Sequence, residues 1–235
     1  MTIREGIIKQ ASKLVLFLAD WLFPKECVGC GIEGGWLCPV CRERLSWQPY
    51  QVCLICGAET DGKICPGHNW ALDKVVAAAD YNDLLVKDLI KICKYHFSKE
   101  AAQELADLLL LFWQKQNISF HREVIIMPTP LSRRRLNWRG FNQAAILAKM
   151  LAENLQFDYS DKLLKIKNTK PQVSLLAHDR LSNLRDCFVW RGQALTDKTI
   201  LLIDDVATTG ATLNECAKVL KQAGAKRVWG IVVAK

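Results

Sequence analysis

The chain has 235 residues, of which 50% are hydrophobic and 24% charged, a composition typical of a globular protein that excludes a disordered one. This length allows one domain or two and is enough to bury a sizeable core. The formal net charge of +8 favours polyanionic partners, such as nucleic acid or phosphorylated ligands, through nonspecific attraction.

Residues 1–23 predict an amphipathic helix and not a targeting segment. The apolar run at 14–19 is interrupted by Asp20, has no small-residue cleavage site behind it and is far too short to span a bilayer. We expect the helix to pack on its own protein, with docking on a membrane surface as the alternative. Apolar residues recur at helical spacing before Pro24, where the helix should end: Ile7, Ile8, Leu14, Phe17, Leu18 and Trp21.

Seven of the ten cysteines lie between positions 27 and 65, in pairs separated by two residues. Cys65-Pro-Gly-His68 has the same spacing with histidine in the last place. Four such pairs supply eight thiolate or imidazole ligands, which is enough for two tetrahedral zinc sites. The simplest assignment is sequential, although crossed pairing stays open: Cys27, Cys30, Cys38 and Cys41 in the first site, and Cys53, Cys56, Cys65 and His68 in the second.

Both zinc sites lack an open ligand position, so they are predicted to be structural. Disulfides are the alternative, but the lack of a secretory segment favours a reducing cytosol. His68 is the least secure ligand, because it could instead be a solvated loop histidine. The remaining cysteines, Cys93, Cys187 and Cys216, are expected as small hydrophobic core residues.

The residues after this ribbon predict alternating strands and helices. We expect a strand at 75–81, helices at 83–95 and 99–113, and a short buried strand at 124–127 that Pro128 stops. The boundary of the main domain should fall near 70–74. Residues near the join of the two helices could hold pyrophosphate oxygens, although a solvated basic helix end is the favoured interpretation: Lys91, Lys94, Tyr95 and His96.

Residues 131–143 combine arginines with aromatic side chains, and a helix is expected behind them at 142–154. Charge and stacking surfaces together suit a diphosphate, or the backbone and bases of a single-stranded nucleic acid. A solvated basic loop is the alternative. Residues 165–188 are also polar and basic, as in a mobile flap beside a phosphate site. The residues of the first stretch are Arg133, Arg134, Arg135, Trp138, Arg139 and Phe141.

The most informative stretch lies near the C-terminus. Residues 199–203 predict a strand buried on both faces, followed directly by Asp204 and Asp205. Thr212 is the expected N-cap of a helix at 213–223, which Gly224 closes, and a second buried strand follows at 228–234. The loop of this βαβ unit lies outside the carboxyl end of a strand, where open α/β sheets bind ligands.

The composition of that loop predicts its ligand. Hydroxyl donors, small residues and the helix behind them suit a phosphate. Two carboxylates would repel this anion, so they should face sugar hydroxyls or a magnesium ion, as a phosphorylated sugar would provide. An ordinary turn after a buried strand is the alternative. The doubled acid and the loop, Asp204, Asp205, Val206, Ala207, Thr208, Thr209, Gly210, Ala211 and Thr212, resemble the phosphoribosyl pyrophosphate (PRPP) motif of type I phosphoribosyltransferases.

The chain as a whole resembles the ComF family of DNA-uptake (competence) proteins, which are sometimes catalogued as amidophosphoribosyltransferases. Two departures from the family pattern are His68, where cysteine is more frequent, and Trp138, where a charged residue is common. The matching elements span nearly the full chain in the family's order: the double zinc ribbon, Pro128-x-Pro130, Arg139-Gly-Phe-Asn-Gln143, Thr169-x-x-Gln172 with Leu175, Arg180 and Asn183, and the PRPP motif.

The resemblance implies an α/β protein with a type I phosphoribosyltransferase fold, in which helices flank a mostly parallel sheet. The expected parts are a helix at 1–23, a double zinc ribbon at 24–72 and a phosphoribosyltransferase-like domain at 73–235. Two structural zinc ions, PRPP with magnesium, and transforming single-stranded DNA are the implied ligands, with a competence helicase and a membrane DNA channel as partners. No transmembrane segment is expected, and the location is the cytoplasm or the inner face of the membrane.

Two hypotheses of different classes remain. In the favoured one, the protein is a PRPP-binding module whose ribbon and basic loops handle single-stranded DNA. In the other, it is a phosphoribosyltransferase with an unidentified acceptor. Asp204 and Asp205 would then serve ribose and metal, while Arg139 and Arg180 would hold the leaving group or another phosphate. No glutaminase domain precedes the fold, so an amidophosphoribosyltransferase is poorly supported.

Overall fold

The computed structural model describes residues 24–48, 50–116, 118, 120, 123–167, 184 and 186–235. The predicted helix at 1–23 and the stretch that contains Arg180 lie outside the described residues. The chain forms two compact units, Met1–Leu45 and Ser46–Lys235, so the three-part division expected from the sequence stays a prediction. In the part that the structure describes, no helix is both long and apolar enough to cross a membrane.

The smaller unit is organised around its four cysteines. Cys38 is the N-cap of α2 (Pro39–Glu43), and its sulfur accepts a hydrogen bond from the amide of Cys41. Glu26 pairs with Glu33 in an isolated antiparallel bridge, which closes the first turn of the chain. The described residues of this unit, 24–45, contain one short helix and few buried apolar side chains, so we expect cross-linking to stabilise their shape.

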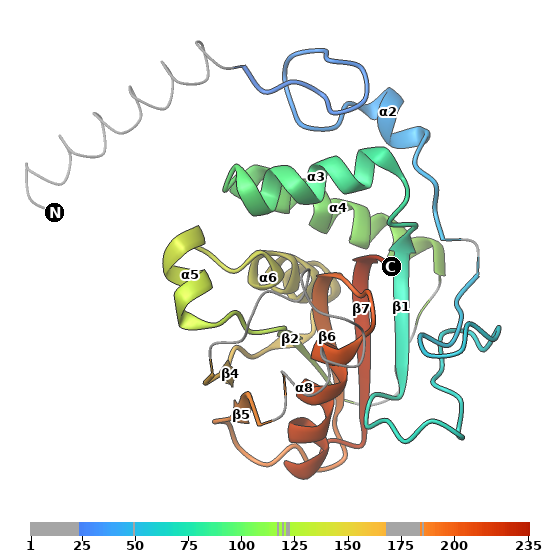
Figure 1. The fold of residues 1–235 in the computed structure, drawn as a ribbon, viewed down its shortest axis with the longest axis vertical. Helices are drawn as coiled ribbons and strands as arrows, with labels where there is room; N and C mark the ends of the chain where they lie inside the picture. The colour runs from blue at the N-terminus through green and yellow to red at the C-terminus, as the bar shows by residue number, and fades with distance from the viewer. Residues whose placement is uncertain are drawn as a thin grey trace, which may run out of the picture. The chain divides into compact units, whose positions relative to one another are not determined.

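The larger unit is built on a five-stranded parallel sheet (Figure 1). Its strands in spatial order are β1 (Lys74–Ala79), β7 (Arg227–Ala234), β6 (Thr199–Val206), β2 (Val124–Pro128) and β3 (Asp158–Tyr159). Every residue of β1 and β2 is buried, as the continuous apolar runs in the sequence predict for strands covered on both faces. The α/β class and the mostly parallel sheet expected from the sequence are therefore confirmed.

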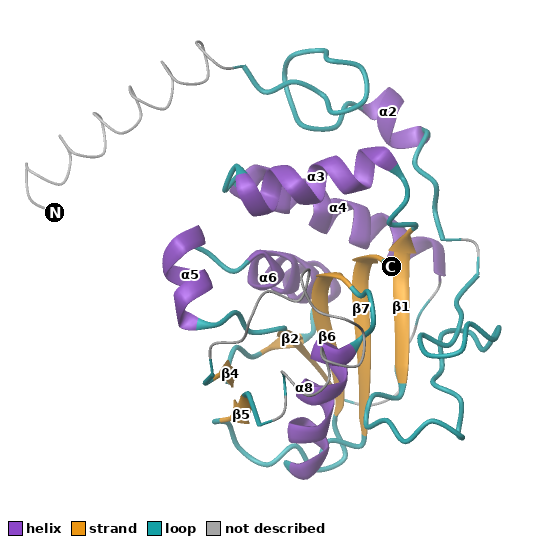
Figure 2. Cartoon of the chain, viewed as in Figure 1, coloured by secondary structure: helices purple, strands orange, loops and turns teal. Residues whose placement is uncertain are grey.

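Helices cover both faces of this sheet (Figure 2). On one face α6 (Gln143–Leu155) packs on β2, β3 and β6 and against α4 (Lys99–Gln116), which in turn contacts α3 (Leu84–Tyr95). On the other face α8 (Ala211–Gln222) packs on β7 and on β5 (Phe188–Trp190), which pairs with β4 (Leu163–Lys165) in a small antiparallel sheet. From β2 the chain moves to β3 at one edge of the sheet, and from β6 it moves toward β7 in the opposite direction. Because crossovers between parallel strands are right-handed as a rule, opposite directions put the connecting helices α6 and α8 on opposite faces.

Three local expectations were wrong. β6 continues through both carboxylates to Val206, because its last residues still pair with β7. α8 begins at Ala211 with Gly210 as its N-cap at φ 68°, so Thr212 lies inside the helix. Residues 133–139 form α5 (Arg133–Arg139) instead of a loop, since Ser132 caps the helix and Gly140 ends it in the left-handed conformation.

The second half of the ribbon covers the outer edge of β1. The amide of Gln48 donates to Ala78 O over 2.9 Å, and the amide of Val75 donates to Gly62 O over 2.9 Å. Between them, the side-chain amide of Gln51 donates to Ala77 O and accepts from Ala77 N, over 2.9 and 3.0 Å. An edge strand that would otherwise present free backbone groups is thereby paired along its length.

We expect Gln51→Ala to lower the free energy of unfolding by about 1–3 kcal/mol, because it leaves both backbone groups of the fully buried Ala77 without this partner. Gln48→Ala is the matched control, since its side chain only donates to Tyr50 O at the surface and should change stability by less than about 0.5 kcal/mol. Urea unfolding of the three proteins measures both effects. Equal stability of the two variants would contradict this role of Gln51.

Candidate functional site

The doubled acid lies at the point where the connections of the sheet diverge. β2 and β6 are neighbours, and the chain leaves their carboxyl ends toward opposite sides of the sheet, through α6 and α8. In open α/β sheets, ligands bind in the crevice at such a switch point. The loop therefore lies outside the end of a strand, as the sequence predicts. The crevice is bounded by Thr129 after β2 and by Val206 at the end of β6.

Asp205 is held by two helices on one face of the sheet. It is only 4% exposed, and its Oδ1 lies 2.9 Å from Lys94 Nζ at the end of α3. Its Oδ2 accepts a hydrogen bond of 3.1 Å from Gln143 Nε2 in the first turn of α6. Gln143 Oε1 in turn accepts from the guanidinium of Arg139, which extends the network to α5. Asp205 is thus the centre of a buried polar network.

The charges of this network stabilise one another. Burial opposes the charged form of Lys94, but the charge and hydrogen bond of Asp205, together with the charge of Asp204, outweigh it and raise the lysine pKa. Burial lowers the pKa of the Arg139 guanidinium, while Asp205 acts in the opposite direction. Lys94 therefore belongs to the site, against the favoured expectation of a solvated helix end. The sequence signal was a basic residue in the last turn of the helix that precedes α4.

Asp204 points away from this network, because side chains alternate along a strand. It is half-buried, Thr129 donates a side-chain hydrogen bond to it, and its Oδ1 accepts from the amide of Asp205 over 2.9 Å. Burial, together with the charge of Asp205, raises the pKa of Asp204 to about 7. A carboxylate in this state is one that a magnesium ion or other cation would stabilise in its charged form.

The loop after β6 presents backbone amides. Ala207 and Ala211 are buried, whereas Thr208 is exposed and Thr209 and Thr212 are half-buried. Because Gly210 has no side chain, no side-chain cap occupies the first amides of α8. The start of a helix, with its partial positive charge and its backbone amides, is a place where an anion can bind.

A basic and aromatic surface lies on α5 and at the end of α3. Arg133 and Arg134 are exposed and Arg135 is half-buried. Trp138 is 59% exposed and packs edge-on against Phe97, with ring centroids 5.0 Å apart. Phe97 is itself 40% exposed and has a φ of 57°, a strained conformation for a bulky residue.

Two expectations about this basic stretch change with the structure. Phe141 is 8% exposed, so it belongs to the interior, and Phe97 takes its place beside Trp138. Arg139 is 9% exposed, and its Nε has no hydrogen-bond partner among the described residues. Its contact with Gln143 makes it a support of the Asp205 network, and its use as a phosphate ligand stays a prediction.

The eight metal-ligating residues form two groups. In each group the ligand atoms lie within 4.8 Å of one another, and the pairs Cys30–Cys38 and Cys56–Cys65 have sulfurs 3.7 Å apart. Tetrahedral zinc with Zn–S bonds of about 2.3 Å requires sulfur separations of about 3.8 Å, so both sets fit zinc. The grouping is sequential: Cys27, Cys30, Cys38 and Cys41, and Cys53, Cys56, Cys65 and His68.

The chemistry of the donors agrees with metal binding. All ten cysteines lie in described residues and are free of disulfides. Burial opposes ionisation of Cys27 and Cys53, but backbone amides that donate to their sulfurs lower each pKa to about 6. His68 Nε2 is buried without a hydrogen-bond partner among the described residues, as expected of a ring nitrogen kept for a metal.

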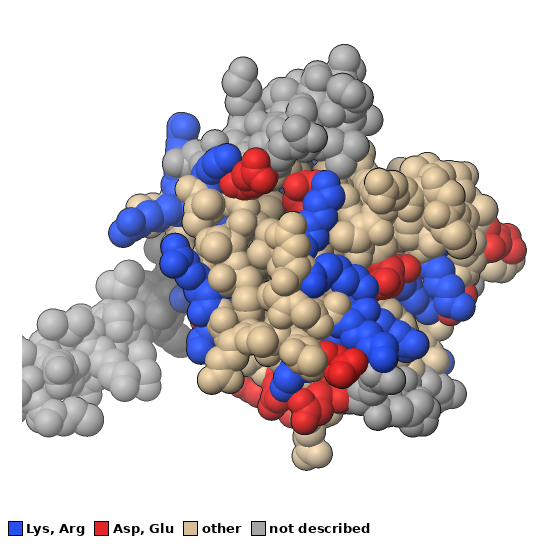
Figure 3. All heavy atoms as spheres, turned by 90° about the horizontal axis from the view of Figure 1, so that it is seen from below, with Lys and Arg blue, Asp and Glu red and all other residues tan. Residues whose placement is uncertain are grey.

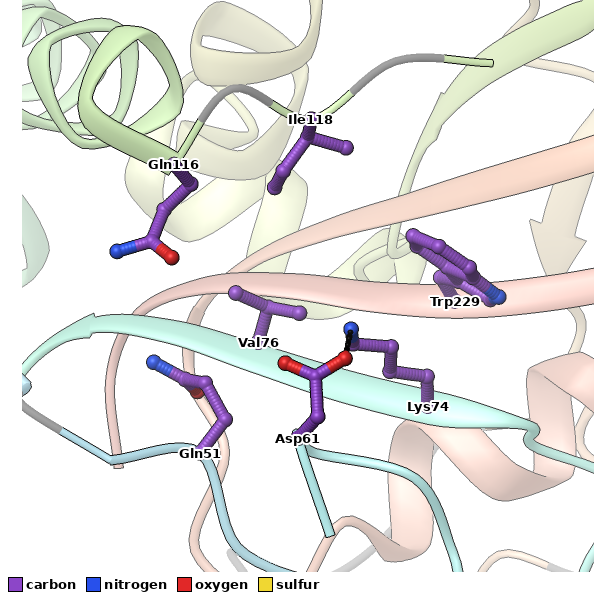
Figure 4. A pocket seen from close by; sticks show the side chains of 7 residues that line it. All are labelled: Gln51, Asp61, Lys74, Val76, Gln116, Ile118 and Trp229. Carbon is purple, nitrogen blue, oxygen red and sulfur yellow. Dashed lines mark hydrogen bonds and ion pairs between the residues drawn. The ribbon is translucent and has the colours of Figure 1, made fainter. Parts of the chain in front are cut away.

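A pocket of about 220 Å³ lies beside the beginnings of β1 and β7, at the opposite end of the sheet (Figure 4). Its lysine is already neutralised, since Lys74 Nζ lies 2.6 Å from Asp61 Oδ2. The face seen from below mixes basic and acidic side chains (Figure 3). The pocket therefore does not offer the unopposed positive charge that an anion needs. The pocket is lined by Gln51, Asp61, Lys74, Val76, Gln116, Ile118 and Trp229.

Two family models match separate parts of the chain. The phosphoribosyl transferase domain matches residues 137–235, and the double zinc ribbon domain matches residues 18–68. Together with the parallel sheet and the loop after β6, the first match identifies a type I phosphoribosyltransferase fold. The second match and the two ligand groups identify structural zinc sites.

Curated relatives match between about half and nine-tenths of the chain. Competence protein F of Haemophilus influenzae is 31% identical over 228 residues, which cover 90% of this chain and 98% of that protein. The DNA utilization protein YhgH of Escherichia coli O6:H1 is 30% identical over 216 residues, covering 82% of this chain and 93% of the relative. Competence protein ComFC of Streptococcus pneumoniae is 37% identical over 113 residues, 48% of this chain and 49% of that protein. The chain therefore belongs to the ComF family of competence proteins.

Proposed function

We propose that this protein binds PRPP with magnesium at the loop after β6 and handles single-stranded DNA on the α5 surface during DNA uptake. PRPP binding is supported by one observation. The start of α8, which has no side-chain cap, and the half-buried Asp204 lie at the same switch point of the sheet. The amides suit the 5′-phosphate, and the carboxylate suits ribose hydroxyls or the magnesium ion. Asp205 is already paired with Lys94, so its contribution is to fix the end of β6.

The second part rests on the exposed arginines of α5 beside the Phe97–Trp138 pair. Arginines bind the phosphates of a single strand, and exposed aromatic rings stack on its bases without sequence preference. The names of the curated relatives, competence protein F and DNA utilization protein, agree with a role in DNA uptake. A cytoplasmic location, a helicase and a membrane channel follow from that role and are part of the proposal.

A phosphoribosyltransferase with an unidentified acceptor is the alternative, which the match to the phosphoribosyl transferase domain favours. In that reaction the ribose carbon loses pyrophosphate through a positively charged transition state, and a carboxylate near the ribose would stabilise it. We propose Asp204 for this task. Pyrophosphate release on addition of nucleobases, abolished by Asp204→Asn, would support the enzyme over the binding module.

We expect calorimetry to detect PRPP binding in the presence of magnesium, and Asp204→Asn to weaken it about tenfold or more, because one carboxylate contact to the metal or ribose is lost. Leu164→Ala is a control, because this residue is 43% exposed on β4 and its side chain has no assigned role in the site. Absence of binding to the unaltered protein would reject PRPP as its ligand.

The raised pKa of Asp204, about 7, predicts a pH dependence of stability. Since the folded state holds this proton up to a higher pH than the unfolded chain, with its ordinary pKa near 3.9, stability falls as pH rises between these values. The loss is at most about 4 kcal/mol and smaller where solvent reaches the carboxylate. Urea unfolding between about pH 5 and 8 should show that Asp204→Asn gains stability over the wild type as pH rises. Parallel curves would contradict the raised pKa.

We expect an oligothymidylate to bind in a salt-dependent way. Replacing Arg133, Arg134 and Arg135 by Ala should reduce the slope of log K against log salt by about 2, because up to three phosphate contacts are lost. Trp138→Ala should weaken binding by about 1–3 kcal/mol and leave the slope unchanged, since it removes stacking only.

Fluorescence anisotropy with a labelled oligonucleotide measures both changes. Arg227→Ala, an exposed arginine at the beginning of β7, is the matched control and should leave the affinity nearly unchanged. Equal loss of affinity in Arg227→Ala and in the α5 variants would show nonspecific attraction by the whole protein and would refute a dedicated surface.

A further inference from the structure

The second zinc ribbon packs directly against the loop after β6. A Cβ placed on Gly210 would lie 2.2 Å from Leu54 Cδ2 and 3.0 Å from a ring atom of Trp70, so both side chains touch the glycine backbone. Leu54 lies between the ligands Cys53 and Cys56. Trp70 follows the ligand His68 by two residues, and its amide donates to His68 O over 2.8 Å. The contacts to Gly210 thus come from the immediate neighbours of the metal ligands.

A second connection joins the ribbon to the start of α8. The side-chain oxygen of Asn214, which is 2% exposed, accepts hydrogen bonds from the amides of Ala71 and Leu72, over 2.9 and 3.4 Å. The amide of Asn214 itself donates to Gly210 O over 2.9 Å. The chain that leaves the second metal site is therefore bound to the same helical turn that would hold a phosphate.

The loop itself has few side chains that could hold it in place. It consists of small and hydroxylated residues, and its buried members are the two alanines and Gly210. A segment with so few apolar contacts of its own opens easily, unless a neighbour packs on it. Leu54, Trp70 and Ala71 supply that packing, since they lie against the core cluster that contains Ala207 and Ala211.

We propose that the second zinc site is a positioning element for the anion-binding loop, acting through Leu54, Trp70 and Asn214. Zinc at Cys53, Cys56, Cys65 and His68 fixes the knuckle that carries Leu54 and the start of the chain that reaches Trp70. These two side chains fix the left-handed Gly210, and thereby the direction of the first amides of α8. The proposal does not include the first zinc site, whose ligands belong to the separate unit Met1–Leu45.

This inference about the second zinc site depends on the proposed function in one respect, the identity of the ligand that the loop binds. The position of the loop can be measured without one, by hydrogen–deuterium exchange of the amides at 214–217 in the full-length zinc-loaded protein, because the first of these amides donates to Gly210 O over 2.9 Å. Leu54→Ala should speed their exchange about tenfold, because a contact worth roughly 1.4 kcal/mol is removed. Ile55→Ala is the matched control from the same knuckle, since Ile55 is 39% exposed, and it should leave the exchange unchanged. Metal analysis should find two zinc ions in both variants.

A comparison of the two metal sites completes the test. Cys65→Ser removes a ligand of the second site and should speed exchange at 214–217, whereas Cys41→Ser, in the first site, should not. Equal exchange in Leu54→Ala and in the wild type would overturn the proposal, even if Cys65→Ser unfolds the ribbon. Equal effects of the two cysteine variants would also overturn it, because they would indicate general loss of stability.

The same variants separate this inference from the proposed function. If PRPP with magnesium binds the wild type, Leu54→Ala should weaken binding about tenfold while Ile55→Ala binds normally. If PRPP does not bind the wild type, the proposed function fails, and the exchange rates alone decide whether the ribbon positions the loop. Unchanged affinity in Leu54→Ala, with faster exchange, would refute the claim that this contact matters for the ligand.

Discussion

The ion pair between Asp205 and Lys94 determines how the candidate site is arranged. An unpaired carboxylate in this buried position would be costly, and the lysine together with Gln143 compensates it. Because these partners come from α3 and α6, one side chain at the end of β6 ties two helices to the central strand. Asp205 is thereby committed to the structure, and we propose the adjacent Asp204, on the other face of the strand, as the carboxylate that meets a ligand.

The surroundings of Asp204 are those of a binding group. Because its pKa is near 7, Asp204 lowers the stability of the folded protein when it is charged. A residue with a purely structural role has no need of such a raised pKa. A metal ion or a donor from a sugar would offset this loss of stability. The loop beside it leads into a helix that has no side-chain cap. We therefore propose that one phosphorylated, metal-bound ligand completes both halves of the site.

The two zinc sites have the same donor spacing but different surroundings. The first joins the described residues of its unit, which include one short helix. The second belongs to the larger unit, where its residues pair with the edge of β1 and pack on Gly210. We therefore propose that zinc in the second site supports both the edge of the sheet and the candidate ligand-binding loop, although the site has no open position for a reaction.

The sequence by itself determined the features that depend on local spacing: the four metal-ligand pairs, the buried strand before Asp204, and the small residues of the loop. Spacing fixes these because neighbours in the chain are neighbours in space. Only the tertiary structure decided that Lys94 reaches Asp205 from the end of α3, that Phe97 replaces Phe141 beside Trp138, and that Leu54 packs on Gly210. These contacts join residues far apart in the chain, and their partners are chosen by helix packing and sheet order, which no local pattern records.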